Sequence, residues 1–154
     1  MLDIVFNNST GNKIYGKGFF KKVIEQALKT FDFKFKSSGK VELSVNLVGE
    51  RKITELNKKY RGKNKPTDVL SFPLGEKIGM KRVFDGIIAL GDIFICLPLA
   101  KRYAEKGDVG LDFKLAFLTV HGFLHLLGHE HERSAEKAKK MDILQSKILK
   151  DLNL

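Results

Sequence analysis

The chain has 154 residues, of which 43% are hydrophobic and 30% charged, with 14 Gly and 3 Pro. This composition is typical of one globular domain over residues 1–154, and it excludes collagen, low-complexity disorder and a coiled-coil rod. The single Cys excludes an intramolecular disulfide framework and a cysteine-based zinc finger. The net charge of +10, from 28 Lys and Arg against 18 Asp and Glu, favours an anionic partner such as nucleic acid, acidic lipid or a ribosome.

The first half of the chain alternates predicted strands and helices. Residues 2–7 have strand character, and the hydrophobic residues of 17–33 recur at helical spacing. Residues 40–48 alternate hydrophobic and polar side chains, which indicates a strand with one buried face. A short helix over 50–60 and a strand over 67–72 follow, separated by a basic loop.

The second half predicts a central strand followed by three helices. Residues 86–96 are almost entirely apolar, as in a strand covered on both faces. A helix over 97–107 comes next, and Asp108 can cap a helix over 109–127 that is apolar almost all round and therefore buried. Ser134 can cap the last helix. These elements predict an α/β (α+β) fold, with a small mixed sheet of about four strands and helices packed against it.

The sequence predicts neither a secretory signal nor a membrane span. Residues 1–8 carry an acid and no basic residue, unlike the start of a signal peptide. Residues 109–127 are long enough to span a bilayer, but they contain Asp112, Lys114 and two histidines. We therefore expect a cytoplasmic protein with no membrane partner.

All four histidines lie within 11 residues, at His121, His125, His129 and His131. The first two are four residues apart, so on a helix they share one face and can bind one metal ion. Gly128 follows the last helical turn, where a left-handed glycine would bring His131 back toward the pair as a third ligand. Three protein ligands leave one tetrahedral position open, which is typical of catalytic zinc. The sequence thus predicts a metal site on a buried helix.

The sequence leaves the roles of two residues just before His131 open. His129 can replace His131 as a ligand, or act beside the metal as a proton relay, and the spacing favours His131. Glu130 can orient a ligand imidazole, act as a proton relay, or simply be solvated.

The spacing His-x-x-x-His-x-x-Gly-x-x-His also matches the metzincin peptidases. Those enzymes carry a Glu directly after the first His as general base, whereas this chain has Gly122. A peptidase of that mechanism is therefore disfavoured, although the metal-binding pattern is retained.

Residues 58–65, Lys-Lys-Tyr-Arg-Gly-Lys-Asn-Lys, include five basic side chains and no acid. Such a cluster can neutralise phosphates, and Arg61 can offer two parallel N–H donors to one of them. A solvated helix end would look similar. The RNA-binding candidates in this loop are Lys59, Arg61, Lys63 and Lys65.

Three sequence blocks together resemble the YbeY family. The first runs from Leu-Asn at 56–57 through Tyr-Arg-Gly-Lys-Asn-Lys-Pro-Thr-Asp-Val-Leu-Ser-Phe-Pro at 60–73. The second is Leu-Gly-Asp-Ile at 90–93, and the third is His-Gly-x-Leu-His-Leu-x-Gly-x-x-His at 121–131. The family consists of bacterial and organellar metal-dependent endoribonucleases implicated in ribosomal RNA maturation.

The resemblance implies a single α/β domain, one zinc ion per chain on His121, His125 and His131, and a catalytic role for Arg61 in the cleft. It implies a single-strand endoribonuclease that processes the 3′ end of small-subunit ribosomal RNA and serves ribosome quality control. The implied partners are ribosomal RNA and the small ribosomal subunit. One departure is visible: the family commonly has Tyr or Phe and then Asp before the third His, where this chain has His129 and Glu130.

Two other functions compete with this prediction. The first is a non-catalytic, metal-containing ribosome-assembly factor that binds ribosomal RNA through the basic loop. The second is a metallohydrolase with a small or peptide substrate. Gly122 disfavours the peptidase form, and the net charge of +10 favours a polyanionic substrate.

Overall fold

The computed structural model describes residues 1–30, 39–74, 83–128 and 134–154. The elements within them follow the predicted order, with one addition, the two-residue strand β4. The strands are β1 (Leu2–Asn8), β2 (Lys40–Val48), β3 (Val69–Pro73), β4 (Val83–Phe84) and β5 (Ile87–Cys96). The helices are α1 (Lys17–Thr30), α2 (Glu50–Arg61), α3 (Leu97–Lys106), α4 (Leu111–Leu126) and α5 (Ala135–Leu152).

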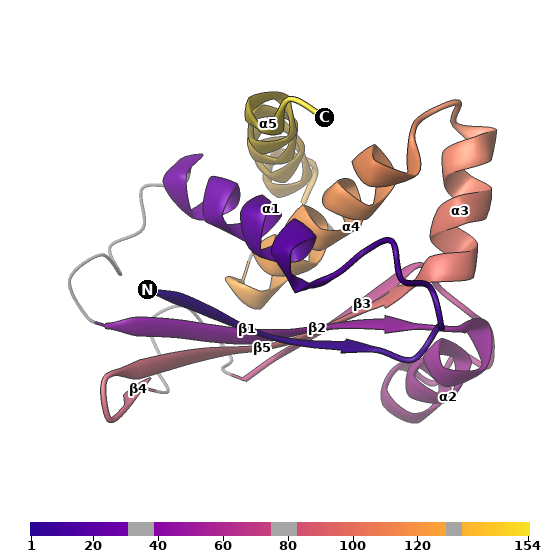
Figure 1. The fold of residues 1–154 in the computed structure, drawn as a ribbon, viewed down its shortest axis with the longest axis horizontal. Helices are drawn as coiled ribbons and strands as arrows, with labels where there is room; N and C mark the ends of the chain where they lie inside the picture. Colours follow the sequence, from indigo (N-terminus) through magenta and orange to yellow (C-terminus); the bar gives the residue numbers. More distant parts are fainter. Residues whose placement is uncertain (31–38, 75–82, 129–133) are drawn as a thin grey trace.

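The strands form one mixed sheet in the order β1-β2-β5-β3, which confirms the predicted fold class (Figure 1). β1, β2 and β5 are parallel, whereas β3 runs antiparallel to β5 and β4 pairs with the start of β5. β5 is central, as its apolar sequence predicts. β3 is the edge strand next to β5. The basic loop leads directly into β3, so this loop lies at that edge of the sheet.

Helices α1 and α4 cover one face of the sheet, α5 packs on these two helices, and α2 lies against the other face (Figure 1). Nine of the 16 residues of α4 are buried, because sheet, α1, α3 and α5 surround it. Full burial of one large apolar side chain contributes about 1.5–3 kcal/mol, so α4 is a major part of the core. The predicted metal-binding helix is therefore held by packing on several sides.

The predicted start of this helix is wrong. α4 begins at Leu111, its N-cap is Gly110, and no side chain caps it. Asp108 has a left-handed backbone, with φ of 51°, and its N–H donates to the carbonyl of Glu105 at 3.2 Å. Asp108 thus belongs to the turn that ends α3, two residues too early to cap α4.

The other boundaries agree with the sequence to within about two residues. The predicted strand over 67–72 is β3, and Ser134 caps α5 by accepting a hydrogen bond from the N–H of Lys137 at 3.1 Å. The predicted helix over 17–33 is α1, which ends at Thr30; residues 31–33 lie outside the described residues. Across the described ranges no single helix is long and apolar enough to cross a membrane, and α3 and α4, which pass this test only together, are bent by 118°.

Candidate active site

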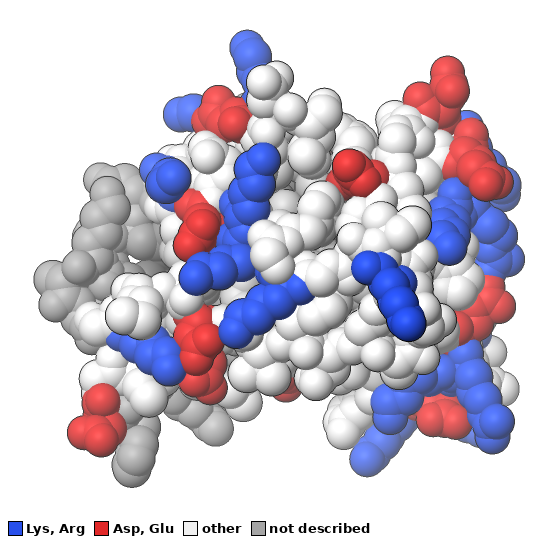
Figure 2. Space-filling model, viewed as in Figure 1, with Lys and Arg blue, Asp and Glu red and all other residues white. Residues whose placement is uncertain are grey.

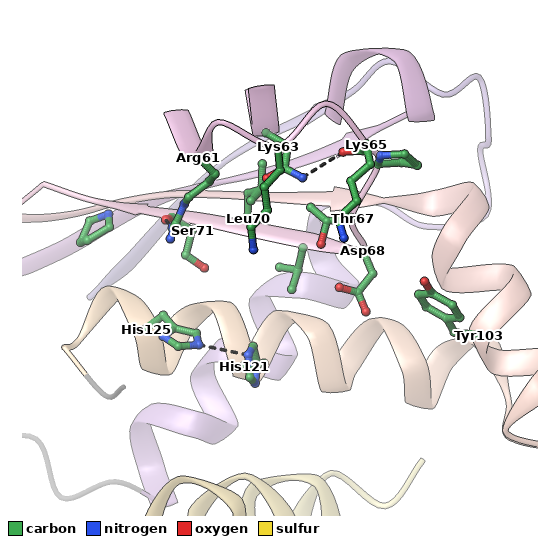
Figure 3. A pocket seen from close by; sticks show the side chains of 14 residues that line it. Arg61, Lys63, Lys65, Thr67, Asp68, Leu70, Ser71, Tyr103, His121 and His125 are labelled. Carbon is green, nitrogen blue, oxygen red and sulfur yellow. Dashed lines mark hydrogen bonds between the residues drawn. The ribbon is translucent and has the colours of Figure 1, made fainter. Parts of the chain in front are cut away.

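A cavity of about 850 Å³ brings the histidines and the basic loop together. One wall is α4, with His121 and His125. The other is the loop after α2 and strand β3, whose side chains point toward α4 (Figure 3). The lining residues are Asn57, Arg61, Lys63, Lys65, Pro66, Thr67, Asp68, Val69, Leu70, Ser71, Pro73, Tyr103, His121 and His125. Two motifs some 60 residues apart in sequence therefore face one space.

His121 and His125 converge as their spacing predicts. Their Nε2 atoms are 3.0 Å apart, and their rings meet edge to face with centroids 4.6 Å apart. A zinc–nitrogen bond is about 2.0–2.1 Å long, so two nitrogens on one tetrahedral ion lie roughly 3.3–3.4 Å apart, and a small rotation of either ring would open the pair to that separation. The pair therefore fits two ligands of a single metal ion.

The third predicted ligand is not tested by this geometry. His131, and the proposed relay groups His129 and Glu130, all lie outside the described residues. Within the described ranges no group of three His, Cys, Asp or Glu side chains gathers as a metal site would require. Ligation by His131 stays a prediction, supported by the turn that precedes it: Gly128 adopts the predicted left-handed conformation, with φ of 88°.

Gly122 is required by the packing of α4 on the sheet. A Cβ atom at this position would lie 2.9 Å from Ile93 Cγ2 and 3.1 Å from Ser71 Oγ. Such a contact leaves no space for a longer side chain. The Glu that a metzincin needs at this position therefore cannot be accommodated, which strengthens the case against a peptidase.

Gln145 is a site residue that the sequence analysis missed. It lies on α5 with 3% of its surface exposed, and its Oε1 is 3.3 Å from Nδ1 of His121. An available signal was its place on the inward face of the last helix, between the buried Met141 and Ile148. A buried polar side chain on an apolar face needs a hydrogen-bonding partner, and here that partner is a candidate metal ligand.

The N-terminal end of α4 is anchored by a second polar contact. The Tyr15 hydroxyl donates to the carboxylate of Asp112, in the first turn of the helix. Burial, reinforced by this hydrogen bond, raises the pKa of Tyr15 to about 12. Both ends of the metal-binding helix are thus tied to other elements.

The opposite wall is cationic and exposed. Arg61 ends α2, and its Nη2 donates to the backbone carbonyl of Ser71 on β3 at 3.2 Å. Asn57, buried within α2, donates from Nδ2 to the carbonyl of Lys65 at 2.9 Å, which folds the basic loop back over the cavity. Lys63 and Lys65 line the cavity as well.

Lys59 does not line the cavity. Its Nζ lies over the ring of Tyr60, 5.1 Å from the centroid. Figure 2 shows Lys and Arg spread over the visible face among Asp and Glu, so the net charge of +10 does not by itself mark a site. The charges that line the cavity do indicate an anionic ligand, because three cations and one carboxylate, Asp68, line it.

Comparison with known proteins gives one consistent answer. The model of the family described as endoribonuclease YbeY matches residues 5–153. The chain belongs to this family. It is 42% identical over 149 residues to the endoribonuclease YbeY of Sulfurihydrogenibium sp. strain YO3AOP1, covering 97% of this chain and 91% of that one. It is 39% identical over 151 residues to that of Persephonella marina, covering 97% and 92%.

A solved structure has the same fold. The solution structure of a Thermotoga maritima protein aligns with a TM-score of 0.64 and 27% identity, over 97% of this chain and 89% of the other. The predicted YbeY family, fold class and enzyme class are confirmed. The described parts of the blocks that carry the resemblance fall on α2 to β3, on β5, and on α4 with the turn after it. The YbeY signature therefore includes both walls of the cavity and the strand that pairs with β3.

Proposed function

We propose that this chain is a metal-dependent, single-strand endoribonuclease that acts in ribosomal RNA maturation. The observation that carries the proposal is the cavity in which two converging imidazoles face a cationic loop. Imidazole nitrogens suit a transition metal, and clustered Arg and Lys suit a phosphodiester backbone. The family name, endoribonuclease, agrees with this pairing.

His121, His125 and the predicted third ligand, His131, would hold one zinc ion. When bound, zinc supplies Lewis acidity toward a phosphoryl oxygen. Three nitrogen ligands favour zinc over magnesium, which prefers oxygen ligands. His129 and Glu130 are the proposed proton-relay groups beside this site.

Arg61 is the proposed catalytic cation. Its hydrogen bond to the Ser71 carbonyl holds the guanidinium group against β3. A guanidinium group has five N–H donors, and this contact uses one nitrogen. The remaining donors can bind phosphoryl oxygens and stabilise the negative charge that develops in the transition state.

The remaining lining residues suit a single strand. Lys63 and Lys65 can neutralise neighbouring phosphates, and Tyr103, 41% exposed on α3, offers a ring to an unpaired base. Bases in a duplex are already stacked and paired, whereas those of a single strand are free to stack on an aromatic side chain. We further propose that the substrate is the 3′ end of small-subunit ribosomal RNA, that the chain meets it on the small subunit in the cytoplasm, and that it serves ribosome quality control.

The test uses untagged protein, whose metal content is first measured by elemental analysis. Zinc-loaded wild type and His121→Ala are then incubated with precursor small-subunit ribosomal RNA. We expect endonucleolytic cleavage by the wild type and none by the variant. Cleavage by both would show a contaminating nuclease. Cleavage by neither, with retained RNA binding, would favour a non-catalytic assembly factor.

A further inference from the structure

The buried Gln145 connects α5 to the histidine pair. Its Oε1 lies 3.3 Å from His121 Nδ1, and its Nε2 lies 3.4 Å from the backbone carbonyl of Phe117. The ring of Phe117 is nearly parallel to that of His121, at an interplanar angle of 11° and a centroid distance of 6.2 Å. The imidazole is thus held at one nitrogen by an amide and beside one face by a phenyl ring.

The Phe117 carbonyl determines how the Gln145 amide must point. A backbone carbonyl only accepts hydrogen bonds, so the NH₂ group of the amide must face it. The amide oxygen is then left facing His121 Nδ1. Because that oxygen only accepts, Nδ1 must carry the proton if the contact is a hydrogen bond.

This hydrogen bond has a consequence at the other ring nitrogen. In a neutral imidazole with a proton on Nδ1, Nε2 carries the lone pair. That Nε2 is the atom 3.0 Å from Nε2 of His125. The lone pair is therefore directed to the point where the two histidines converge.

We propose that Gln145 is a positioning residue that holds His121 as its Nδ1–H tautomer, with the Nε2 lone pair presented for metal binding. The tautomer is inferred from the contacts of Gln145 with His121 and with the Phe117 carbonyl, and the consequence for metal binding rests on the function proposed above. An outer hydrogen-bond acceptor of this kind fixes the ring of a metal-binding histidine and strengthens the ligand. Gln145 lies 24 residues from His121 in sequence, so the packing of α5 on α4 makes the contact.

The first test needs neither metal nor RNA. The metal-free full-length chain is labelled with ¹⁵N, and the tautomer of His121 is read from the ring nitrogen chemical shifts at a pH above about 8, where imidazole is neutral. We expect the Nδ1–H form in the wild type and in Gln145→Glu, which keeps an acceptor. Gln145→Met is of similar length but has no amide, so we expect a mixture of tautomers or the Nε2–H form. An Nε2–H tautomer of His121 in the wild type would overturn the proposal.

The second test measures zinc affinity by competition with a chelator. Gln145→Met should bind zinc about 10- to 100-fold more weakly than the wild type, as is usual when an outer partner of a ligand is lost. The control is Ile148→Val, which removes one methylene from the same helix face of α5 without touching His121. It should lower the melting temperature but change neither tautomer nor affinity.

The two tests fail in different ways. If Gln145→Met and Ile148→Val weaken zinc binding equally, Gln145 acts only through the stability of α5 and the proposal is wrong. If the wild type has the expected tautomer but binds no zinc and cleaves no RNA, the proposed function fails while the positioning of His121 stands.

Discussion

The two walls of the cavity are built in different ways. On the α4 wall the site is part of the core: Gly122 packs against the sheet, Gln145 of the neighbouring α5 is 3% exposed, and nine of the 16 residues of α4 are buried. On the opposite wall Arg61, Lys63 and Lys65 are exposed, at the end of a helix and in a loop. A metal site needs fixed ligand geometry, whereas a polyanion needs accessible charge. Substitutions on α4 should therefore disturb both metal binding and the fold, and those on the loop wall should disturb function much more than stability.

The largest effect is expected from His125→Ala. Loss of a ligand should exceed the 10- to 100-fold cost of losing an outer partner, so we expect zinc affinity and RNA cleavage to fall by more than about 100-fold. Elemental analysis after dialysis measures the first quantity, and a gel-based cleavage assay the second. One retained equivalent of zinc in this variant would refute the assignment of His125 as a ligand.

Gly122→Ala tests how closely α4 packs on the sheet. The new methyl group would meet Ile93 and Ser71, and such overpacking costs about 1–3 kcal/mol, partly offset by the higher helix propensity of Ala. The matched control is Gly18→Ala in α1, where an added Cβ meets nothing within 4 Å. Urea unfolding should show a lower free energy of unfolding for Gly122→Ala and an unchanged or higher one for Gly18→Ala. Equal effects would mean that α4 can move away from the sheet.

Arg61 should separate function from stability. Arg61→Ala loses one hydrogen bond to the Ser71 carbonyl, worth about 1 kcal/mol, so the melting temperature should fall by only about 2–4 °C. Cleavage should fall by roughly 10- to 100-fold or more, as for other groups that stabilise transition-state charge. Arg61→Lys should restore RNA binding but not full turnover, because Lys lacks the planar fork. Full turnover in Arg61→Lys would show that Arg61 makes only a diffuse phosphate contact. Unfolding of Arg61→Ala would show that Arg61 is needed for the fold.

Sequence reasoning succeeded where the interactions are local. The spacing of His121 and His125 predicts a shared helix face, and the apolar run of 86–96 predicts the central strand. It failed at the start of α4, because Asp108 and Gly110 both suit a helix boundary and only the turn after α3 decides between them. Gln145 was missed because the local pattern shows only that it lies on the inward face of the last helix, whereas its contact with His121 depends on how α5 packs against α4.

The anchor at the start of α4 should respond to pH. The pKa of Tyr15 is raised to about 12 in the folded chain, above about 10 in the unfolded chain. Because the pKa is raised on folding, the stabilisation that protonated Tyr15 gives the folded chain is fully present below pH 10 and is lost as the pH rises toward 12. Tyr15→Phe should lower the free energy of unfolding by about 1–3 kcal/mol at pH 8, since it removes a donor to a carboxylate. The difference from the wild type should shrink between pH 10 and 12.

A double-mutant cycle with Asp112→Asn measures the Tyr15–Asp112 coupling directly. The coupling should be favourable at pH 8 and decline over the same interval, because ionised Tyr15 would face the negative Asp112. Coupling that stays constant from pH 8 to 12 would contradict the role of this hydrogen bond as an anchor of α4.

The smallest effect is expected from the lysines of the loop wall, and it distinguishes the cavity from the rest of the basic segment. Removing Lys63 and Lys65 together, as Lys63→Gln/Lys65→Gln, should weaken RNA binding several-fold at low salt. The slope of log K against log salt should also fall by up to about 1.4, at about 0.7 per phosphate contact to a single strand. The control, Lys58→Gln/Lys59→Gln, removes the same charge from α2 at positions that do not line the cavity. If the salt dependence falls equally in both double variants, RNA is attracted by the net charge of +10 and not by the lysines of this wall. In that case the RNA-binding role predicted for Lys59 would stand beside those of Lys63 and Lys65.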